Sequence, residues 1–287
     1  MITPPPVSFG VRFRAAVDAR GPLCAGIDPH RSLLTAWGLS DDVAGLRRFA
    51  LTATEVLAPI VPVVKPQSAF FERFGSRGVA VLEEVVTTAR EAGALVLLDV
   101  KRGDIGSTVQ AYADAYLDPA SPLCADAVTA SPYLGFGSLR PMLDVAATFG
   151  RGVFVLALTS NPEGAQVQRA RTADGRTVAG AILDEIAAVN AGASPCGSVG
   201  AVVGATVGET GEDFTRVNGP LLAPGLGAQG AGPKDLRRVF GAALHNVLPA
   251  TSRALLAAGP SRQALRDAAE QLRDAFGAAV GTADAGL

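Results

Sequence analysis

Eight short apolar segments recur along this chain, and most of them lack the alternation of apolar and polar residues that marks a strand with one face in water. The segments span residues 23–27, 60–64, 95–100, 127–130, 153–158, 199–203, 221–223 and 244–248. Helical apolar spacing occupies stretches between them, such as residues 43–57, 79–92, 139–147, 179–189 and 236–243. Because strands that alternate with helices form parallel sheets, eight such units predict a (β/α)8 barrel rather than an open sheet.

The length of the chain fits one such barrel. A (β/α)8 barrel typically takes about 250 residues, and this chain has 287, of which 48% are apolar. No linker, internal repeat or low-complexity tract divides it. We therefore expect an α/β protein that forms a single TIM barrel over residues 1–287, with flexible ends at residues 1–10 and 277–287. An amphipathic helix over residues 262–276 is expected to pack outside the barrel.

Charge and cysteine content argue against several partners and locations. The net charge of -2 creates no field that would attract a nucleic acid or an anionic membrane. Cys24, Cys124 and Cys196 have no Cys-x-x-Cys spacing, so neither a disulfide framework nor a zinc site is indicated. The N-terminal segment lacks the regions of a secretory signal, and no apolar run is long enough to span a bilayer. We expect a cytoplasmic protein.

Charged residues follow the first three predicted strands. Asp28 ends the first strand, Lys65 ends the second, and Asp99 and Lys101 lie at the end of the third, closely followed by Asp104. The carboxyl ends of barrel strands meet at one rim, where barrel enzymes carry their active sites. Two residues apart in an extended strand, Asp99 and Lys101 would share a face, and a glycine turn would bring Asp104 back toward Lys101.

This group of charges has both a structural and a catalytic interpretation. Ion pairs at a barrel rim are often structural, and a single Asp-x-Lys pair favours that interpretation. Four charges that converge at the strand ends favour the catalytic interpretation, an array of two carboxylates, Asp99 and Asp104, and two ammonium groups, Lys65 and Lys101.

A glycine-rich segment follows the seventh predicted strand. Residues 224–230 contain Gly-x-Gly-x-x-Gly, but a dinucleotide-binding fingerprint should follow the first strand of its unit and precede an acidic residue by about 20 positions. Neither condition is met here. A glycine-rich loop at this place in a barrel is typical of phosphate binding, and Arg253, after the eighth strand, could supply a charged donor. The alternative is a tight turn beside a solvated arginine.

The remaining polar residues give weaker indications. Ser160, just beyond the fifth strand, could hydrogen-bond a ligand or cap the turn into Asn161. His30 and His245 are the only histidines and form no metal-binding motif. Cys24 lies in an apolar run, where a buried thiol is the default, and the chain has no Gly-x-Ser-x-Gly elbow. Neither a metal site nor covalent hydrolase chemistry is predicted.

In combination, these segments resemble orotidine 5'-phosphate decarboxylase. The resemblance rests on Asp99-x-Lys101-x-x-Asp104-Ile105 with Thr108, preceded by Asp28 and Lys65. Residues 98–108, 130–135 and 159–163 are similar to the longer bacterial branch of this family, found in actinobacteria. The similarity covers about residues 21–260, which is nearly the whole chain.

The resemblance implies a reaction and its catalytic residues. Orotidine 5'-monophosphate (OMP) would be converted to UMP and CO₂ in de novo pyrimidine biosynthesis, without a metal or an organic cofactor. Lys101 would protonate pyrimidine C6 as CO₂ departs, Asp99 would lie against the substrate carboxylate, and Lys65 and Asp104 would complete the charge array. The carbanion left at C6 lies in the ring plane and cannot be delocalised, so the chemistry needs a fixed cation at that position.

The resemblance also implies how the nucleotide is bound. Asp28 and Lys65 would hydrogen-bond the ribose hydroxyls. Ser160 would contact the edge of the pyrimidine, with Thr159 as the alternative. The 5'-phosphate would be held by the side chains of Gln229 and Arg253 and by the loop that contains Gly230.

A homodimer with shared active sites is implied as well. The residues that would reach across the interface into the partner's site are Asp104, Ile105 and Thr108.

Three other functions stay open at this point. A magnesium-dependent decarboxylase or aldolase of the same superfamily shares the Asp-x-Lys-x-x-Asp segment. Such an enzyme carries a glutamate where this chain has Lys65, and the positive charge of this lysine disfavours a divalent ion. A class I aldolase would need Lys65 or Lys101 as a neutral amine, whereas flanking carboxylates hold a lysine in its protonated form. A catalytically inactive nucleotide-binding barrel would be expected to lack one of the charged residues, and all are present.

Overall fold

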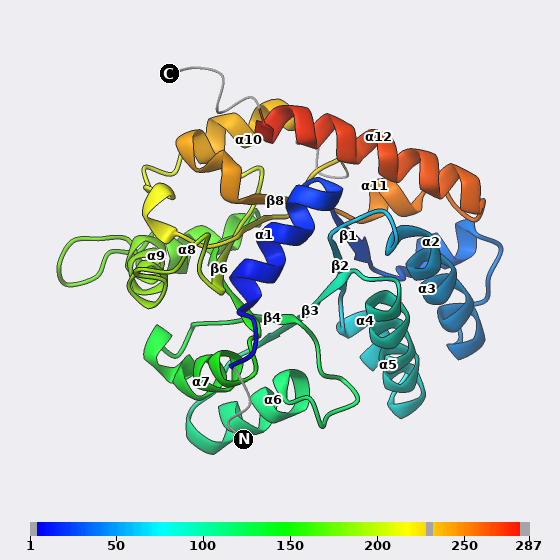
Figure 1. Ribbon diagram of the computed structural model, residues 1–287, viewed down its shortest axis with the longest axis horizontal. Helices are drawn as coiled ribbons and strands as arrows, with labels where there is room; N and C mark the ends of the chain where they lie inside the picture. Colours follow the sequence, from blue (N-terminus) through cyan, green and yellow to red (C-terminus); the bar gives the residue numbers. More distant parts are fainter. Residues whose placement is uncertain (1–4, 228–231, 282–287) are drawn as a thin grey trace.

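The chain forms a closed barrel of eight parallel strands, seen here in a computed structural model that describes residues 5–227 and 232–281 (Figure 1). The strands follow one another around the barrel in chain order, and pairing of the first with the eighth closes it. They are β1 (Cys24–Ile27), β2 (Val63–Pro66), β3 (Leu95–Arg102), β4 (Ala127–Ala130), β5 (Gly152–Leu158), β6 (Val199–Val203), β7 (Leu221–Ala223) and β8 (Val247–Thr251). The predicted fold class, a (β/α)8 TIM barrel, is confirmed.

All eight predicted strands are present, and two of them lie about three residues further along the chain than predicted. Residues 60–62 belong to the turn that leads into β2, where Ile60 and Val61 are buried without being in a strand. Residues 241–246 form a 3₁₀ helix, so that β8 begins only at Val247. In both places the apolar residues are explained by burial in the core rather than by a strand.

Helices surround the strands and bury their apolar faces against them (Figure 1). The α-helices are α1 (Phe9–Arg20), α2 (Arg31–Ala36), α3 (Val43–Leu57), α4 (Ala69–Glu72), α5 (Ser76–Glu91), α6 (Gly106–Leu117), α7 (Arg140–Thr148), α8 (Ala165–Gln168), α9 (Val178–Val189), α10 (Pro233–Phe240), α11 (Arg253–Leu256) and α12 (Arg262–Gly281). The 3₁₀ helices are η1 (Phe136–Leu139), η2 (Pro162–Gly164), η3 (Thr215–Val217) and η4 (Gly241–Asn246). Helix α3 is representative, since Asp42 caps its first turn and one side of the helix, including Leu46 and Phe49, is buried.

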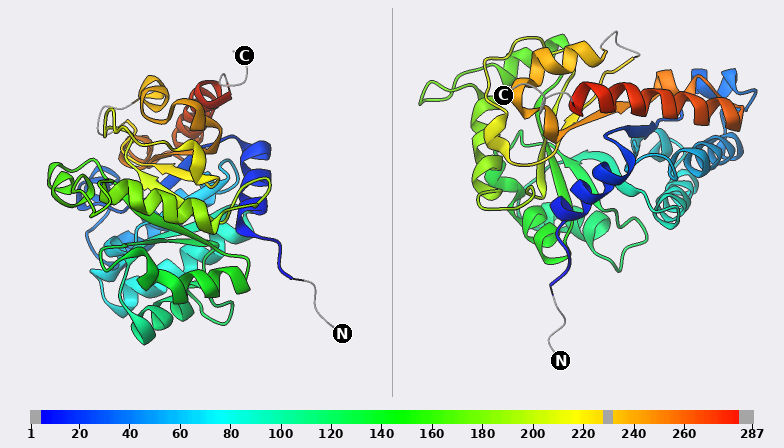
Figure 2. Two further views of the ribbon diagram at one scale, coloured as in Figure 1. Left: turned by 90° about the vertical axis from the view of Figure 1, so that its left-hand side faces the viewer. Right: turned by 45° about the horizontal axis from the view of Figure 1, so that its top comes forward.

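Helix α1 lies across one end of the barrel and includes the last two residues of the segment 1–10 that was expected to be flexible (Figure 1). The helix begins at Phe9, and both Phe9 and Phe13 are buried. Phe9 packs edge-on against Phe154 of β5, within a cluster of side chains from the barrel interior. These inward-facing side chains need an apolar cover at the amino-terminal end of the strands, and α1 supplies it. Figure 2 (left) shows α1 at the opposite end of the barrel from the loop after β5.

At the carboxyl-terminal end, the segment expected to be flexible covers residues 277–287. Helix α12 continues to Gly281, and Phe276 and Ala279 are buried against the rest of the fold. The helix therefore extends as far as its buried apolar positions. Residues 1–4 and 282–287 lie outside the described part of the chain.

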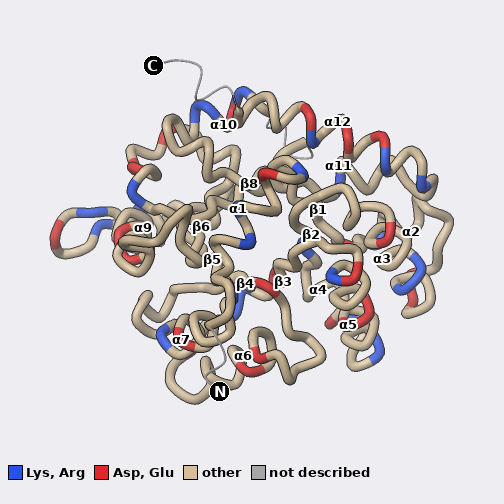
Figure 3. The backbone as a smooth tube through the Cα atoms, in the orientation of Figure 1, with Lys and Arg blue, Asp and Glu red and all other residues tan. Residues whose placement is uncertain are grey.

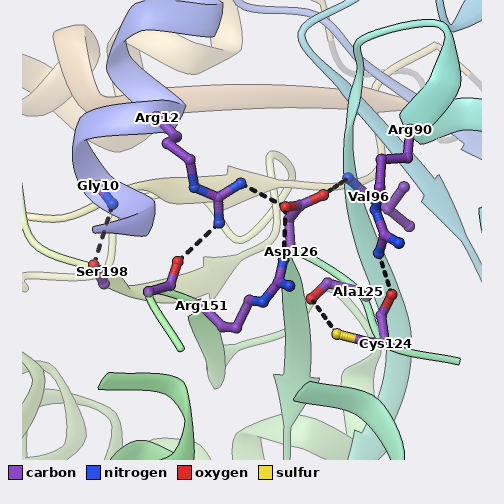
Figure 4. Close-up of polar contacts among 10 residues, drawn as sticks. Gly10, Arg12, Arg90, Val96, Cys124, Ala125, Asp126, Arg151 and Ser198 are labelled. Carbon is purple, nitrogen blue, oxygen red and sulfur yellow. Dashed lines mark hydrogen bonds and ion pairs between the residues drawn. The ribbon is translucent and has the colours of Figure 1, made fainter. Parts of the chain in front are cut away.

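A buried carboxylate ties α1 to the strands (Figure 4). Asp126, just before β4, accepts hydrogen bonds from the guanidinium groups of Arg12 in α1 and Arg151 before β5. Its other oxygen accepts the backbone N–H of Val96 in β3, at 3.0 Å. Three segments of the barrel and the covering helix thus converge on one carboxylate at the end opposite the cavity described below.

The described residues contain no helix long and apolar enough to cross a membrane. Residues of both charge signs alternate along the outer helices, as α5 and α12 show (Figure 3). This mixed surface agrees with the small net charge of -2.

We expect Asp126→Ala to lower the free energy of unfolding by about 3 kcal/mol, because two partly buried guanidinium groups lose their counter-charge. Urea denaturation followed by circular dichroism measures this loss. The control is Asp144→Ala, which breaks the exposed ion pair with Arg140 and should change stability by less than about 0.5 kcal/mol. Equal losses in the two variants would contradict the role assigned to Asp126.

Candidate active site

A cavity of about 430 Å³ opens at the carboxyl ends of the strands, where a barrel enzyme carries its active site. Its polar lining comes from loops and strand ends on both sides of the barrel. These lining residues are Asp28, His30, Lys65, Gln67, Asp99, Lys101, Thr129, Thr159, Thr251, Ser252 and Arg253.

Asp99 is the centre of the charged wall of this cavity. One carboxylate oxygen lies 2.9 Å from Nζ of Lys65, and the other lies 2.6 Å from Nζ of Lys101. Thr129 of β4 donates its hydroxyl to the second oxygen at 2.9 Å. Asp28 lies at the other side of Lys65, with 4.0 Å between the carboxylate oxygen and Nζ. The sequence-based expectation that three strands bring these charges together agrees with the geometry.

Burial and charge oppose each other in this group. Burial alone would raise the pKa of Asp99, but the ammonium groups of Lys65 and Lys101 hold it well below its usual range. Burial alone would lower the pKa of Lys65, but the carboxylates of Asp28 and Asp99 raise it above its ordinary value. The side chain of Lys65 is 8% exposed and that of Lys101 is 43% exposed, so Lys101 is the lysine that a ligand in the cavity can approach.

The strand that carries Asp99 and Lys101 is not regular at this point. The expectation of a simple extended strand is wrong, because β3 advances four positions, from Leu98 to Arg102, while β4 advances only two, from Val128 to Ala130. Lys101 has a φ of 47°, in the left-handed region that residues other than glycine rarely occupy. This bulge, rather than strand alternation, aims the Lys101 side chain back at Asp99.

Asp104, Ile105 and Thr108 do not line the cavity within one chain. Asp104 accepts the backbone N–H of Ile105, and among the described residues it makes no ion pair with Lys101. Ile105 and Thr108 are exposed. The expected return of Asp104 toward Lys101 therefore does not occur inside a single chain.

The fifth strand places Thr159 rather than Ser160 on the cavity wall. Ser160 faces a neighbouring hollow between the loops after β5 and β6. Thr159 also accepts a hydrogen bond from the side chain of Gln168. Of the two candidates for contact with a ligand, Thr159 is the one in the main cavity.

The predicted phosphate site is described in part. Arg253 lines the cavity after β8, as does Gly225 after β7, whose φ of 100° requires glycine. Gln229 and Gly230 lie outside the described residues.

Several cavity residues gave no signal in the sequence. Thr129 lies in an apolar strand with no distinctive motif, and Gln67 and Phe70 belong to the loop and short helix after β2. His30 forms a wall with Phe70, their ring centroids lying 4.2 Å apart. Of these residues, only His30 could have been found from the sequence, because it follows Asp28 by two residues at the end of the first strand.

Among the described residues, no group of three or more His, Cys, Asp or Glu side chains could hold a metal ion. The carboxylates that face the cavity are instead bound to the lysine ammonium groups.

These features together define a barrel enzyme whose candidate active site is a lysine and aspartate array at the carboxyl ends of β1 to β3. Residues 21–268 match the model of the orotidine 5'-phosphate decarboxylase / HUMPS family, and the chain belongs to this family.

Named relatives agree with the family match. The orotidine 5'-phosphate decarboxylase of Salinispora arenicola is 70% identical over 265 residues, 92% of this chain and 95% of that protein. The corresponding protein of Streptomyces coelicolor is 62% identical, with the same coverage. A crystal structure of a Streptomyces avermitilis protein assigned as an orotidine 5'-phosphate decarboxylase matches with a TM-score of 0.95 and 60% identity, covering 98% of this chain and 99% of that one. The Leishmania donovani OMP decarboxylase structure matches with a TM-score of 0.75 and 30% identity, covering 96% of this chain and 100% of that one.

Asp99 makes the stability of the fold depend on pH in the acid range. Its pKa lies below the ordinary value of 3.8, so the ionised carboxylate stabilises the fold above that value, and the stabilisation is lost as the pH falls toward the folded-state pKa. The free energy of unfolding of the wild type should exceed that of Asp99→Asn by a constant amount between about pH 6 and 8, and this excess should shrink below about pH 4. Urea denaturation at each pH measures it, and an excess that stays constant into that acid range would argue against the assignment.

Proposed function

We propose that this chain decarboxylates OMP to UMP and CO₂, a step of de novo pyrimidine biosynthesis, in the cytoplasm. The observation that carries this proposal is the array of Lys65, Asp99 and Lys101 on the wall of the cavity. Family membership and the 70% identical relative named orotidine 5'-phosphate decarboxylase support the substrate.

Lys101 is the proton donor in this proposal. The bond between C6 and the carboxyl carbon breaks, CO₂ leaves, and the electron pair stays at C6 in the plane of the ring. The ring π system cannot delocalise that pair, so a cation fixed beside C6 stabilises the charge as it develops. Lys101 then transfers a proton from Nζ to C6 and regains one from water. Its 43% exposure and its hydrogen bond to Asp99 suit it to this role.

The other cavity residues bind the nucleotide. Asp28 has a buried carboxylate oxygen that no hydrogen bond satisfies among the described residues, and a ribose hydroxyl would supply the donor. Lys65 lies 4.0 Å from that oxygen and would share the contact. Arg253, which lines the cavity just after β8, would bind the 5'-phosphate with Gln229 and Gly230. Binding energy from this remote phosphate can then organise the reacting end of the site.

The reaction proceeds without a metal or an organic cofactor in this proposal. The charge that develops at C6 is stabilised by Lys101, and Lys65 occupies the position beside Asp28 and Asp99 where a divalent cation would otherwise balance two carboxylates. An ammonium group there repels a divalent ion. This arrangement favours the decarboxylase over a magnesium-dependent relative that acts on sugar phosphates.

A spectrophotometric assay in excess EDTA tests the proposed activity. We expect the purified protein to convert OMP to UMP, with the product identified by chromatography. A protein that converts a sugar phosphate only after magnesium is added would belong to the alternative class, and a protein that binds UMP without turnover would be a nucleotide-binding barrel.

Lys101→Ala should lower kcat on OMP by at least about 10³-fold, because the cation and the proton donor are both removed. The Kd for UMP should stay within about tenfold of the wild-type value, since the other ligand contacts remain. Titration calorimetry measures the binding, and Arg47→Ala, which alters an exposed ion pair on α3, serves as the control. Normal turnover by Lys101→Ala would refute the mechanism.

We further propose that the chain is a homodimer with shared sites. Ile105, Tyr133 and Leu134 are 63%, 76% and 54% exposed, an apolar set on the loops after β3 and β4, next to the cavity. Asp104 lies beside this set and has no role in the charge array of its own chain. A second copy placed on this face would cover the apolar side chains and could receive Asp104, Ile105 and Thr108 at its own cavity.

Mixing two inactive variants tests the shared site. Lys101→Ala and Asp104→Ala should each lack activity, and refolding them together should restore it, because one site of the mixed dimer has both residues. Leu134→Glu should give a monomer by light scattering, whereas Val167→Glu, on α8, should leave the dimer intact. No recovery of activity on mixing, or a monomeric wild type, would rule the shared site out.

A further inference from the structure

The bulge in β3 leaves the backbone of Lys101 outside the regular ladder between β3 and β4. The register passes from Leu98 paired with Val128 directly to Arg102 paired with Ala130. Lys101 lies within the extra residues, with a φ of 47°. A left-handed residue other than glycine persists only where its surroundings hold it there.

Thr129 is the residue that holds it. The backbone N–H of Lys101 donates to the Thr129 hydroxyl oxygen at 2.9 Å. The same hydroxyl donates its single proton to a carboxylate oxygen of Asp99, also at 2.9 Å. An ionised carboxylate can only accept, so the direction of both hydrogen bonds is determined. Thr129 is 1% exposed, so both bonds lie in a buried setting.

The oxygen of Asp99 that receives the Thr129 hydroxyl is also the one that receives Nζ of Lys101. A closed path therefore runs from the Lys101 backbone through Thr129 and Asp99 to the Lys101 side chain. The other Asp99 oxygen is held by Lys65, which leaves the carboxylate no freedom to rotate without breaking a bond.

We propose that Thr129 is a positioning residue for the reaction, and that its hydroxyl fixes both the backbone of Lys101 and the rotation of Asp99. This inference rests on the proposed decarboxylase function. A group that must deliver a proton to one carbon atom depends on sub-ångström placement, and small displacements lower the rate of the chemical step. Thr129 acts through Lys101 and Asp99, so its removal should lower kcat while nucleotide affinity is kept.

Thr129→Val tests this role because valine keeps the shape of threonine and removes the hydroxyl. We expect kcat on OMP to fall by about 10- to 100-fold, with KM and the Kd for UMP changed by less than about threefold. Thr129→Ser keeps the hydroxyl and should retain kcat within about threefold of the wild type. Thr54→Val is the matched control, since Thr54 is equally buried in α3 and its hydroxyl donates to the Ala50 carbonyl, its one side-chain hydrogen bond among the described residues.

The outcomes separate this inference from the function on which it rests. A wild-type protein that leaves OMP unchanged refutes the proposed function. If the wild type is active and Thr129→Val has a similar kcat, only the role of Thr129 is refuted. If Thr129→Val does not fold, Thr129→Ser decides. Retained kcat in the serine variant supports the hydroxyl as the functional group, and a loss of tenfold or more overturns it.

Discussion

The ionised carboxylate of Asp99 is the constraint on which the rest of the site depends. A buried charge of this kind is stable only when it is paired and fully hydrogen-bonded. Lys65, Lys101 and Thr129 provide those bonds from β2, β3 and β4. The three neighbouring strands must therefore place these side chains at the same level of the barrel, and β3 must bulge, so that the Asp99 carboxylate receives all of its hydrogen bonds. The same arrangement presents the Lys101 ammonium group to the cavity.

The two ends of the barrel have different tasks. At the amino-terminal end, Asp126 joins α1 to the strands, and α1 covers the apolar interior. At the carboxyl-terminal end, the buried charges are arranged around an open cavity and include an unsatisfied oxygen of Asp28. A buried polar atom without a hydrogen bond lowers stability, so this oxygen on the wall of an open cavity indicates a site prepared for a ligand.

The strand and helix pattern was sufficient to predict the barrel, because buried parallel strands are continuous apolar runs separated by amphipathic helices. The same pattern also predicted that Asp28, Lys65, Asp99 and Lys101 lie at one rim of the barrel. The pattern could not predict the strand register or the irregular backbone of β3. Neither the bulge at Lys101 nor the hydrogen bond from Lys101 to Thr129 leaves a periodic pattern in the sequence. Helix α1 was not predicted, because Phe9 and Phe13 pack against the end of the barrel and are not part of an apolar stripe that runs the length of the helix.

The central claim is that the lysine and aspartate array meets pyrimidine C6 while Arg253 holds the phosphate, and a crystal structure of the complex with UMP tests it most directly. We expect Nζ of Lys101 in contact with C6, the carboxylate of Asp99 on the side where the substrate carboxyl group would lie, and Arg253 on the 5'-phosphate. A complex in which UMP occupies the cavity with C6 out of reach of Lys101, or with its phosphate away from Arg253, would contradict the account.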